Sequence, residues 1–245
     1  MRPHDHIGWV YSGLAELATL ARPFLEEGAS RRERLMLVTE DPFAPEFEAL
    51  VSGIDPEILQ VASVADVYGP SGVVDPARQR TTFLGALEGA VGDGFTGIRV
   101  AADNSPLVDT PERLDAWIGW ELTADRMMAG NPITGLCAFD RDRVAIDTLR
   151  HLATLHPLSS AAEPAPQFLL FAEEDGLHIE GEVDSFAVDH LWLALDVLPP
   201  KTKVTVDVTR AIIRGEGVKR SLQVLSETRG VEVSIVGLGV DAGRN

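Results

Sequence analysis

The chain has 245 residues, of which 45% are hydrophobic and 24% are charged, an ordinary composition for a soluble globular protein with room for two domains. Its formal net charge of -17 at pH 7 argues against binding to nucleic acid or to an anionic membrane, because both need a basic face. The single cysteine, Cys137, excludes an internal disulfide and a cysteine-rich metal cluster.

The first part of the chain alternates short apolar runs with amphipathic segments. Strands are predicted at 6–11, 34–40, 59–68, 95–103 and 133–140. Helices are predicted at 13–28, 44–53, 76–94, 110–130 and 143–156. Alternating elements of this length predict an α/β domain, with a largely parallel sheet covered by helices on its faces.

A segment rich in Ala, Pro and Ser, residues 156–167, follows these elements and has the composition of a linker. Every lysine lies after residue 200, which is a second compositional break. We therefore predict a first domain at 1–158, a linker at 159–166 and a second domain at 167–245.

The second part begins with a predicted hairpin and continues with alternating helices and strands. Strands are predicted at 167–175, 177–184, 203–209 and 231–238, and helices at 186–198 and 217–230. This order predicts a small mixed-sheet α/β domain.

The N-terminal residues lack the order of charged, apolar and small residues that marks a signal peptide. No apolar run approaches the length of a transmembrane helix. We therefore expect a cytoplasmic protein.

Two glycine patterns resemble nucleotide-binding motifs but stand in the wrong context. "GDGFTG", at 92–97, ends a predicted helix and leads into a strand, whereas a dinucleotide fingerprint follows a strand and opens a helix. "GLGVDAG", near the end of the chain, has no helix after it. The chain has no phosphate-loop motif, so ATP hydrolysis is not expected.

Histidine and cysteine leave two further chemistries open. His4 and His6 would face one side of an extended segment, whereas His151 and His156 are five apart and do not stack on a helix. His6 and Cys137 together could ligate a metal, or could form a nucleophile pair. The alternative is that Cys137 is a small buried apolar residue.

The first part resembles the MEDS domain, the sensory domain of methanogen and methylotroph proteins and of the DcmR regulator. The resemblance rests on "HIGWVYSG", "FLEEG", "RLMLVTED", "YGPSGVVDP", "GFTGIRVAAD", "GWELTAD", "LCAFDRDRV" and "LHPL". It implies a RecA/KaiC-like α/β core without a working phosphate loop, and a sensor of small hydrocarbon-like compounds. The family's recurrent histidine and cysteine match His6 and Cys137, whereas "DNSPLV" departs from its pattern.

A sensor of this kind needs a mostly apolar pocket with a few polar anchors. Six residues at strand ends and on one helix are the candidate ligand-binding residues: His6, Tyr11, Arg99, Trp120, Glu121 and Cys137. The alternatives are structural. Trp117 and Trp120 are spaced to pack in a core, and Arg99 could pair with Glu121.

The second part resembles a STAS domain, the fold of anti-sigma factor antagonists. "LHIEGEVDSFAVDHLWLALDVL" matches the strand, turn and first helix of that family, with Asp184 in the turn. "KVTVDVTR" matches its central strand, with Asp207 and Thr209 near the end. The resemblance implies a protein-binding module that recognises an anti-sigma factor or a related kinase-like regulator.

In the phosphorylated members of that family the next helix opens on Asp-Ser-Ser-Gly. Here Arg214 stands in place of the aspartate and Glu216 in place of the phosphoacceptor serine. Glu216 is either a first-turn residue that the helix dipole favours, or a fixed negative charge that imitates phosphoserine. Thr209, Ser221 and Ser226 are the alternative acceptors.

Together these features predict a non-enzymatic signalling protein without a cofactor or a metal. The first domain would sense a small organic ligand and so regulate the partner-switching function of the second; a homodimer is possible. The alternative is an enzyme or a metal-binding protein that uses His6 and Cys137.

Overall fold

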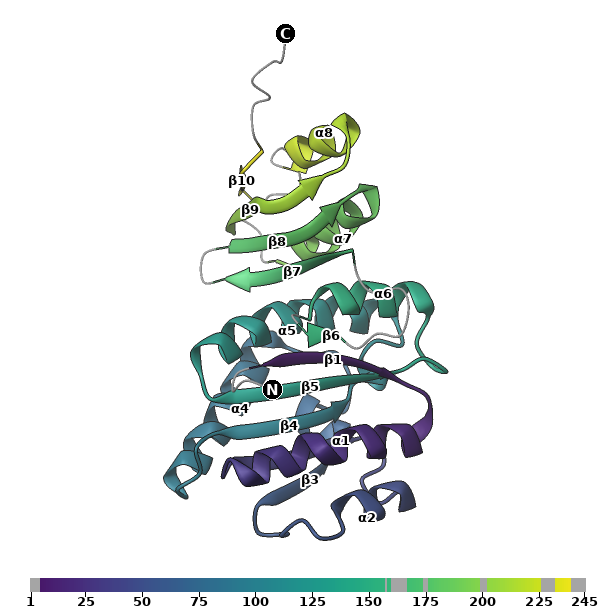
Figure 1. Cartoon of the computed structure of the whole chain (residues 1–245), viewed down its shortest axis with the longest axis vertical. Helices are drawn as coiled ribbons and strands as arrows, with labels where there is room; N and C mark the ends of the chain where they lie inside the picture. The colour runs from purple at the N-terminus through teal and green to yellow at the C-terminus, as the bar shows by residue number, and fades with distance from the viewer. Residues whose placement is uncertain are drawn as a thin grey trace. The chain divides into compact units, whose positions relative to one another are not determined.

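The computed structural model describes residues 5–156, 158–159, 167–173, 176–198, 202–225 and 232–238. The chain divides into two compact units, Met1–Ala165 and Pro166–Asn245 (Figure 1). The division falls at the end of the predicted linker.

The first unit is built on a parallel sheet with the strand order β3-β2-β4-β5-β1-β6. The sixth strand has only two residues. The bounds are β1 (His6–Tyr11), β2 (Arg34–Thr39), β3 (Leu59–Ser63), β4 (Ile98–Asp103), β5 (Ile133–Asp140) and β6 (Leu158–Ser159).

Helices cover both faces of this sheet and enclose two apolar cores. The helices α1 (Gly13–Ser30) and α2 (Pro45–Val51) pack on one face. The other face carries α3 (Val64–Tyr68), α4 (Pro76–Gly92), α5 (Pro111–Gly130) and α6 (Ile146–Thr154), and a short 3-10 helix, Ser105–Leu107, follows β4.

Alternation along each strand decides which side chains meet. On β1, Val10 packs in the core beneath α5, whereas Ile7 and Tyr11 pack in the core beneath α1. On β5, Cys137 belongs to the α5 core and Leu136 to the α1 core. Two residues of neighbouring strands therefore lie on the same face only when they are register partners or differ from register partners by an even number of positions.

The predicted strand at 59–68 is wrong in its second half. The strand β3 ends at Ser63, and the helix α3 begins at Val64. Ser63 accepts a hydrogen bond from the backbone N–H of Asp66, and the Asp66 side chain reaches back to the backbone of Ser63, which is a capping box. The spacing of Ser63 and Asp66 was the signal for this helix, and the apolar run concealed it.

The connection between β1 and α1 confirms that the fold lacks a phosphate loop. The strand ends at Tyr11 and the helix begins at Gly13, so Ser12 alone joins them. The "GDGFTG" segment ends α4 and leads into β4, as predicted. Gly94 adopts a φ of 89°, and a side chain at Gly97 would collide with the carbonyl oxygen of Pro132.

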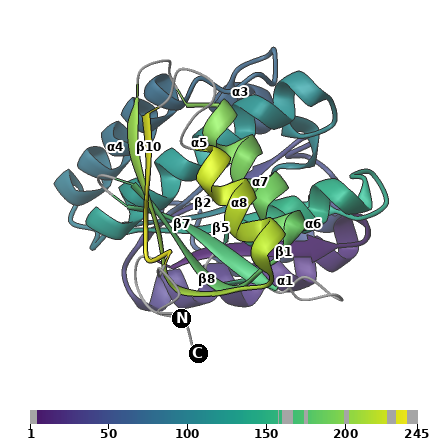
Figure 2. The same ribbon diagram turned by 90° about the horizontal axis from the view of Figure 1, so that it is seen from above.

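The second unit has a mixed sheet with the strand order β10-β9-β8-β7. β7 and β8 pair antiparallel, whereas β9 pairs in parallel with both β8 and β10. Its elements are β7 (Phe168–Glu173), β8 (Gly176–Val183), α7 (Ser185–Asp196), β9 (Lys203–Ile213), α8 (Glu216–Leu225) and β10 (Glu232–Val236). In Figure 2, α7 and α8 lie side by side.

The predicted fold class is thus confirmed: a parallel-sheet α/β unit without a phosphate loop, followed by a smaller mixed-sheet α/β unit. The strand β9 continues to Ile213, four residues past its predicted end. Part of the predicted helix 217–230 lies outside the described residues. In the part of the chain that is described, no helix is both long and apolar enough to cross a membrane.

Candidate functional site

Four polar side chains from four parts of the first unit meet in its interior, on the α5 side of the sheet. His6 begins β1, Glu121 lies in the middle of α5, Cys137 lies on β5, and His156 follows α6. Their exposed fractions are 2%, 1%, 7% and 0% in the same order. We call these four residues the polar cluster.

The parallel register of β1 and β5 brings His6 and Cys137 together. Gly8 pairs with Cys137, and His6 pairs with Gly135. His6 Nε2 lies 3.7 Å from Cys137 Sγ. The alternation of the two strands then places both side chains on the face that α5 covers, which is how residues 131 positions apart become neighbours.

Glu121 lies between the two histidines. One carboxylate oxygen, Oε2, is 2.9 Å from His6 Nε2, and the other, Oε1, is 3.5 Å from His156 Nε2. Neither contact is aligned as a hydrogen bond, and both Glu121 oxygens are buried without a hydrogen-bond partner. The carboxylate and the two imidazoles are therefore held together mainly by the attraction between their opposite charges.

The ring of His156 is fixed from behind. Its Nδ1 lies 2.7 Å from the carbonyl oxygen of Leu152, so Nδ1 must donate the proton and Nε2 is turned toward the cluster. The ring also rests on Gly8, where an added Cβ would lie 2.7 Å from Cγ of His156. The absence of a side chain at Gly8 makes room for the histidine.

Charge within the polar cluster shifts the acid–base equilibria of its members. Burial alone would raise the pKa of Glu121, but the positive charges of His156 and His6 lower this pKa to about 2. Burial alone would lower the pKa of His156, but the Glu121 carboxylate raises it to about 9. The same carboxylate overcomes burial at His6 and raises its pKa as well, with help from Asp125. Without a further ligand, an ionised carboxylate therefore holds protonated imidazole.

Arg99, a predicted ligand-binding residue, lies on the opposite face of the sheet, beneath α1. It is fully buried, and its Nε donates to Glu33 Oε2 at 2.5 Å. Its Nη1 lies 3.3 Å from the carbonyl oxygen of Phe24 and 3.5 Å from Glu27 Oε2. The predicted alternative, an ion pair between Arg99 and Glu121, is therefore wrong, because Arg99 pairs with Glu33 and Glu27 instead.

Tyr11 is also separated from the polar cluster, since it lies at the other end of β1 and faces α1. Burial, followed by the charge of Asp103, raises the pKa of its hydroxyl above the usual range. Asp103 accepts hydrogen bonds from the backbone N–H and the hydroxyl of Ser105 at 3.1 and 2.6 Å. Burial raises the pKa of this carboxyl.

Trp117 and Trp120 pack in the apolar core on the α5 side. The Trp120 ring stacks on Phe83 at 5.5 Å between centroids, and Trp117 meets the rings of Tyr68 and Phe139 edge-on. Glu121 follows Trp120 directly on α5. The two indoles therefore form part of the apolar core that surrounds the Glu121 carboxylate.

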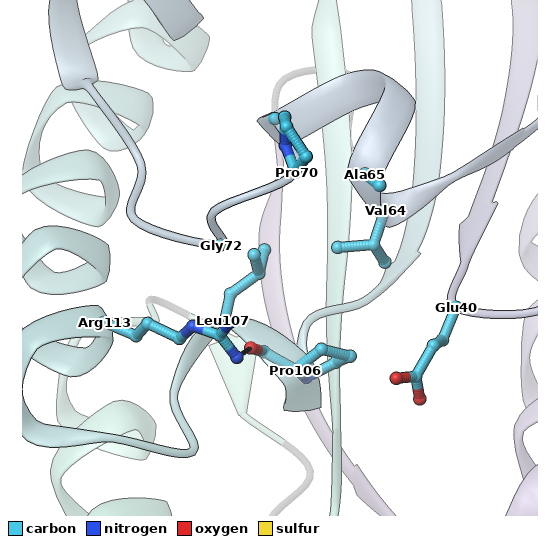
Figure 3. Close-up of a pocket in the computed structure, with 9 residues that line it drawn as sticks. Glu40, Val64, Ala65, Pro70, Gly72, Pro106, Leu107 and Arg113 are labelled. Atoms are coloured by element: carbon cyan, nitrogen blue, oxygen red, sulfur yellow. Dashed lines mark hydrogen bonds between the residues drawn. The ribbon is translucent and has the colours of Figure 1, made fainter.

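A separate pocket of about 170 Å³ lies at the carboxyl ends of β2 and β4. Figure 3 places Glu40 and Arg113 on opposite sides of it. Both charges are already engaged: Arg143 lies 2.8 Å from Glu40, and Arg113 binds the carbonyl oxygens of Ser71 and Pro106. No member of the polar cluster lines this pocket.

His156 is the one member of the polar cluster that the sequence analysis did not place there. Its spacing of five residues from His151 gave no sign of a site, and His151 is not a member of the polar cluster. The segment "LHPL" contained the signal, because β6 follows His156 and pairs with β1 at Ile7 and Gly8. That pairing returns the chain to the start of β1.

In the second unit, two of the predicted switch residues stabilise local structure. Asp184 caps α7, accepting a hydrogen bond from the backbone N–H of Ala187 at 3.0 Å. Asp207 accepts a hydrogen bond from the backbone N–H of Thr209 at 2.8 Å, where the pairing of β8 and β9 is irregular.

Thr209 donates that hydrogen bond, and the corner before α8 carries the remaining two, Arg214 and Glu216. Arg214 forms a two-pronged ion pair with Glu182. Glu216 is the first residue of α8, is exposed, and lies 3.1 Å from Lys219 Nζ. Gly215, with a φ of 97°, makes the turn between them. Ser221 is exposed on α8, and Ser226 lies outside the described residues.

Comparison with known proteins gives a family match for the first unit. The family described as "MEDS: MEthanogen/methylotroph, DcmR Sensory domain" matches residues 5–157. Among solved structures, "EssC (ATPases 2 and 3)" from Geobacillus thermodenitrificans is similar over 94% of this chain and 46% of that one, with 12% identity and a TM-score of 0.35. The chain thus spans less than half of that protein. No curated protein sequence matches the chain.

Proposed function

The chain belongs to the MEDS family of sensory domains, and on that premise we propose that its first unit senses a small ligand at the polar cluster. The observation that carries the proposal is the buried carboxylate of Glu121, held between His6 and His156 without a hydrogen bond to either of its oxygens. Buried polar groups of this kind are costly, and they are concentrated at functional sites.

The position of the polar cluster suits it for signalling. It joins β1, β5, α5 and the end of α6, so a ligand that repositions one side chain acts on several elements. His156 lies just before β6 in the chain, and β6 is followed by the linker to the second unit. A ligand needs only to bind one arrangement of these elements better than another, and no covalent chemistry is required.

A panel of short-chain alcohols, ketones and halogenated alkanes tests the sensor. We expect at least one class to stabilise the intact protein, because a ligand at about 100 times its Kd adds about 2.7 kcal/mol to the stability. For a unit of this size that shift is roughly 5–10 °C in Tm. The measurement is the thermal transition seen in tryptophan fluorescence.

The matched variants are His6→Gln in the polar cluster and His178→Gln in the second unit. The first should remove the stabilisation and the second should leave it unchanged. A panel without any stabilising compound, or an equal effect in both variants, would contradict the proposed sensor.

We further propose that the second unit is a STAS-like protein-binding module whose partner is an anti-sigma factor or a kinase-like regulator. Its mixed sheet and the capped turn at Asp184 support this assignment. So does the exposed carboxylate of Glu216, which supplies a fixed negative charge at the first turn of α8. Because the charge at this corner is fixed, partner binding would be controlled by whether the first unit holds its ligand, and not by phosphorylation.

The partner proposal is tested by capture from a lysate of the source organism. We expect the intact chain to retain a protein with an anti-sigma or kinase-like domain, identified by mass spectrometry. Glu216→Gln should weaken its capture because it removes the charge and keeps the shape. Glu232→Gln is the control, since Glu232 is also exposed and paired with a lysine, Lys203, at 3.0 Å. Equal capture by all three proteins would refute a role for the corner.

A further inference from the structure

We propose that the polar cluster binds a divalent transition-metal ion of the zinc class, with His6, Glu121, Cys137 and His156 as its four ligands. The inference rests on the proposed function for the location of the sensor, and it adds that the sensor is built around a metal. Each of the four residues offers one ligand atom, and these atoms all lie within 4.8 Å of one another.

The donor types select the class of metal. Imidazole nitrogen, thiolate sulfur and carboxylate oxygen are the ligands of zinc sites, whereas Ca²⁺ and Mg²⁺ take oxygen ligands. A site with two imidazoles and one thiolate therefore fits Zn²⁺ or Co²⁺ and does not fit the hard cations. In the described ranges of the chain this is the one set of three or more such residues close enough to share an ion.

Three of the six separations between the ligand atoms are close to those of four-coordinate geometry, and none exceeds 4.8 Å. Ligand atoms about 2.0–2.3 Å from a zinc ion, at tetrahedral angles, lie roughly 3.3–3.6 Å from one another. The separations are 2.9 Å between His6 and Glu121, 3.5 Å between His156 and Glu121, and 3.7 Å between His6 and Cys137. Shifts of about half an ångström would bring all three into the tetrahedral range.

The unpartnered atoms point to the same conclusion. Both Glu121 oxygens and His156 Nε2 are buried without a hydrogen bond. Without a metal, these atoms are held only by the charge attraction between Glu121 and the two histidines, and bonds to a metal would satisfy all of them at once. Their convergence on one point is a second observation, independent of the residue types.

The surroundings of His156 have the form of a metal site's outer shell. A histidine that ligates a metal usually donates its other ring N–H to a carboxylate or a carbonyl. His156 Nδ1 lies against the Leu152 carbonyl oxygen at 2.7 Å, and His6 Nδ1 lies 3.6 Å from Asp125 Oδ1. The Leu152 carbonyl thereby orients the His156 ring with Nε2 toward the shared centre, whereas the Asp125 carboxylate lies just beyond hydrogen-bond distance of His6 Nδ1.

Cobalt titration of the intact, chelator-treated protein tests the proposal. We expect one equivalent of Co²⁺ to bind, to give the visible absorption of a tetrahedral site with a thiolate-to-cobalt charge-transfer band, and to be displaced by Zn²⁺. Cys137→Ser should abolish the charge-transfer band. His156→Gln should weaken binding by at least the roughly 10–100-fold that loss of an outer-shell partner costs.

His178→Gln is the control, because this histidine lies in the second unit, and it should bind as the wild type does. Circular dichroism of each metal-free variant shows whether it is folded, and His156→Gln stands in for Cys137→Ser if the latter is not. Absence of stoichiometric binding, or binding that neither variant alters, would overturn the metal site.

The compound panel, run with and without Zn²⁺, separates the two proposals. Stabilisation by a compound in a protein that binds no metal would overturn the metal site and leave the sensor standing. Tight metal binding with no response to any compound would support the metal site and contradict the sensing of a small organic ligand.

Discussion

Replacement of Arg99 by methionine is expected to lower the free energy of unfolding by about 3–5 kcal/mol, a large effect for a single substitution. Arg99 is fully buried, and Glu33, its closest partner, is 7% exposed. The substitution would leave the Glu33 carboxylate buried without its counter-charge, and it would also remove the contact of the guanidinium with the Phe24 ring at 4.7 Å. The cost comes from the charge left behind more than from the loss of a favourable pair.

The matched control is Arg150→Met. Arg150 forms an ion pair with Asp147 at 3.0 Å, but both side chains are exposed, and exposed pairs contribute about 0–1 kcal/mol. Urea unfolding followed by tryptophan fluorescence measures both changes. A Trp192→Phe background removes the one tryptophan of the second unit, so that Trp9, Trp117 and Trp120 report on the first.

The double variant Arg99→Met/Glu33→Leu separates this mechanism from simple loss of packing. Replacing both charges by apolar groups should restore much of the stability that Arg99→Met loses. A double variant less stable than Arg99→Met, or an Arg99→Met protein within about 1 kcal/mol of the wild type, would contradict the account.

The contribution of His156 to the stability of the metal-free protein is expected to fall by roughly 2–3 kcal/mol as the pH rises from about 6.5 to about 9, and His6, whose pKa is also raised, adds to this decline. The pKa of His156 is about 9 in the folded protein and about 6.5 in the unfolded chain. Below pH 6.5 both states are protonated and the stabilising charge is fully present. As the pH rises through 9 the folded protein loses this proton, and the stabilisation is lost with it.

At acid pH the dependence has the opposite sign, and the stability falls as the pH falls. The pKa of Glu121 is lowered to about 2, so its contribution is present above the unfolded value near 4.3 and is lost as the pH falls toward 2. The polar cluster therefore stabilises the metal-free protein most between about pH 4.5 and 6.5.

Unfolding measured across this range with a chelator present tests the prediction. Glu121→Gln should remove the decline on the alkaline side, because it removes the charge that keeps His156 protonated. A wild-type profile that is flat from pH 6.5 to 9, or an identical decline in Glu121→Gln, would contradict it. With Zn²⁺ bound, the gain over the metal-free protein should increase with pH, since a metal requires deprotonated ligands.

Local sequence patterns determined most of the secondary structure. The strands β1 and β5 match their predicted bounds, because each is a continuous apolar run bounded by polar or turn residues. The start of α5 follows from Thr110, which caps the helix, and from Pro111 in the first turn. The error at 59–68 arose where a capping box lay inside an apolar run, so that two local signals competed.

The sequence, through its resemblance to the MEDS domain, also singled out His6, Glu121 and Cys137 as candidate polar anchors of a ligand pocket. It could not separate them from Arg99 and Tyr11. Which side chains meet on one face of the sheet depends on the register of its parallel strands, and register is set by contacts between segments far apart in the chain.

Only the tertiary structure brought His156 to His6 and placed Glu121 between them. The crossover from β5 through α6 and the return of β6 beside β1 carry His156 to the start of the chain, and Gly8 leaves room for its ring. Sequence spacing is informative for residues within one helix or strand. The polar cluster joins two strands, one helix and the end of another, so its existence was decided by packing alone.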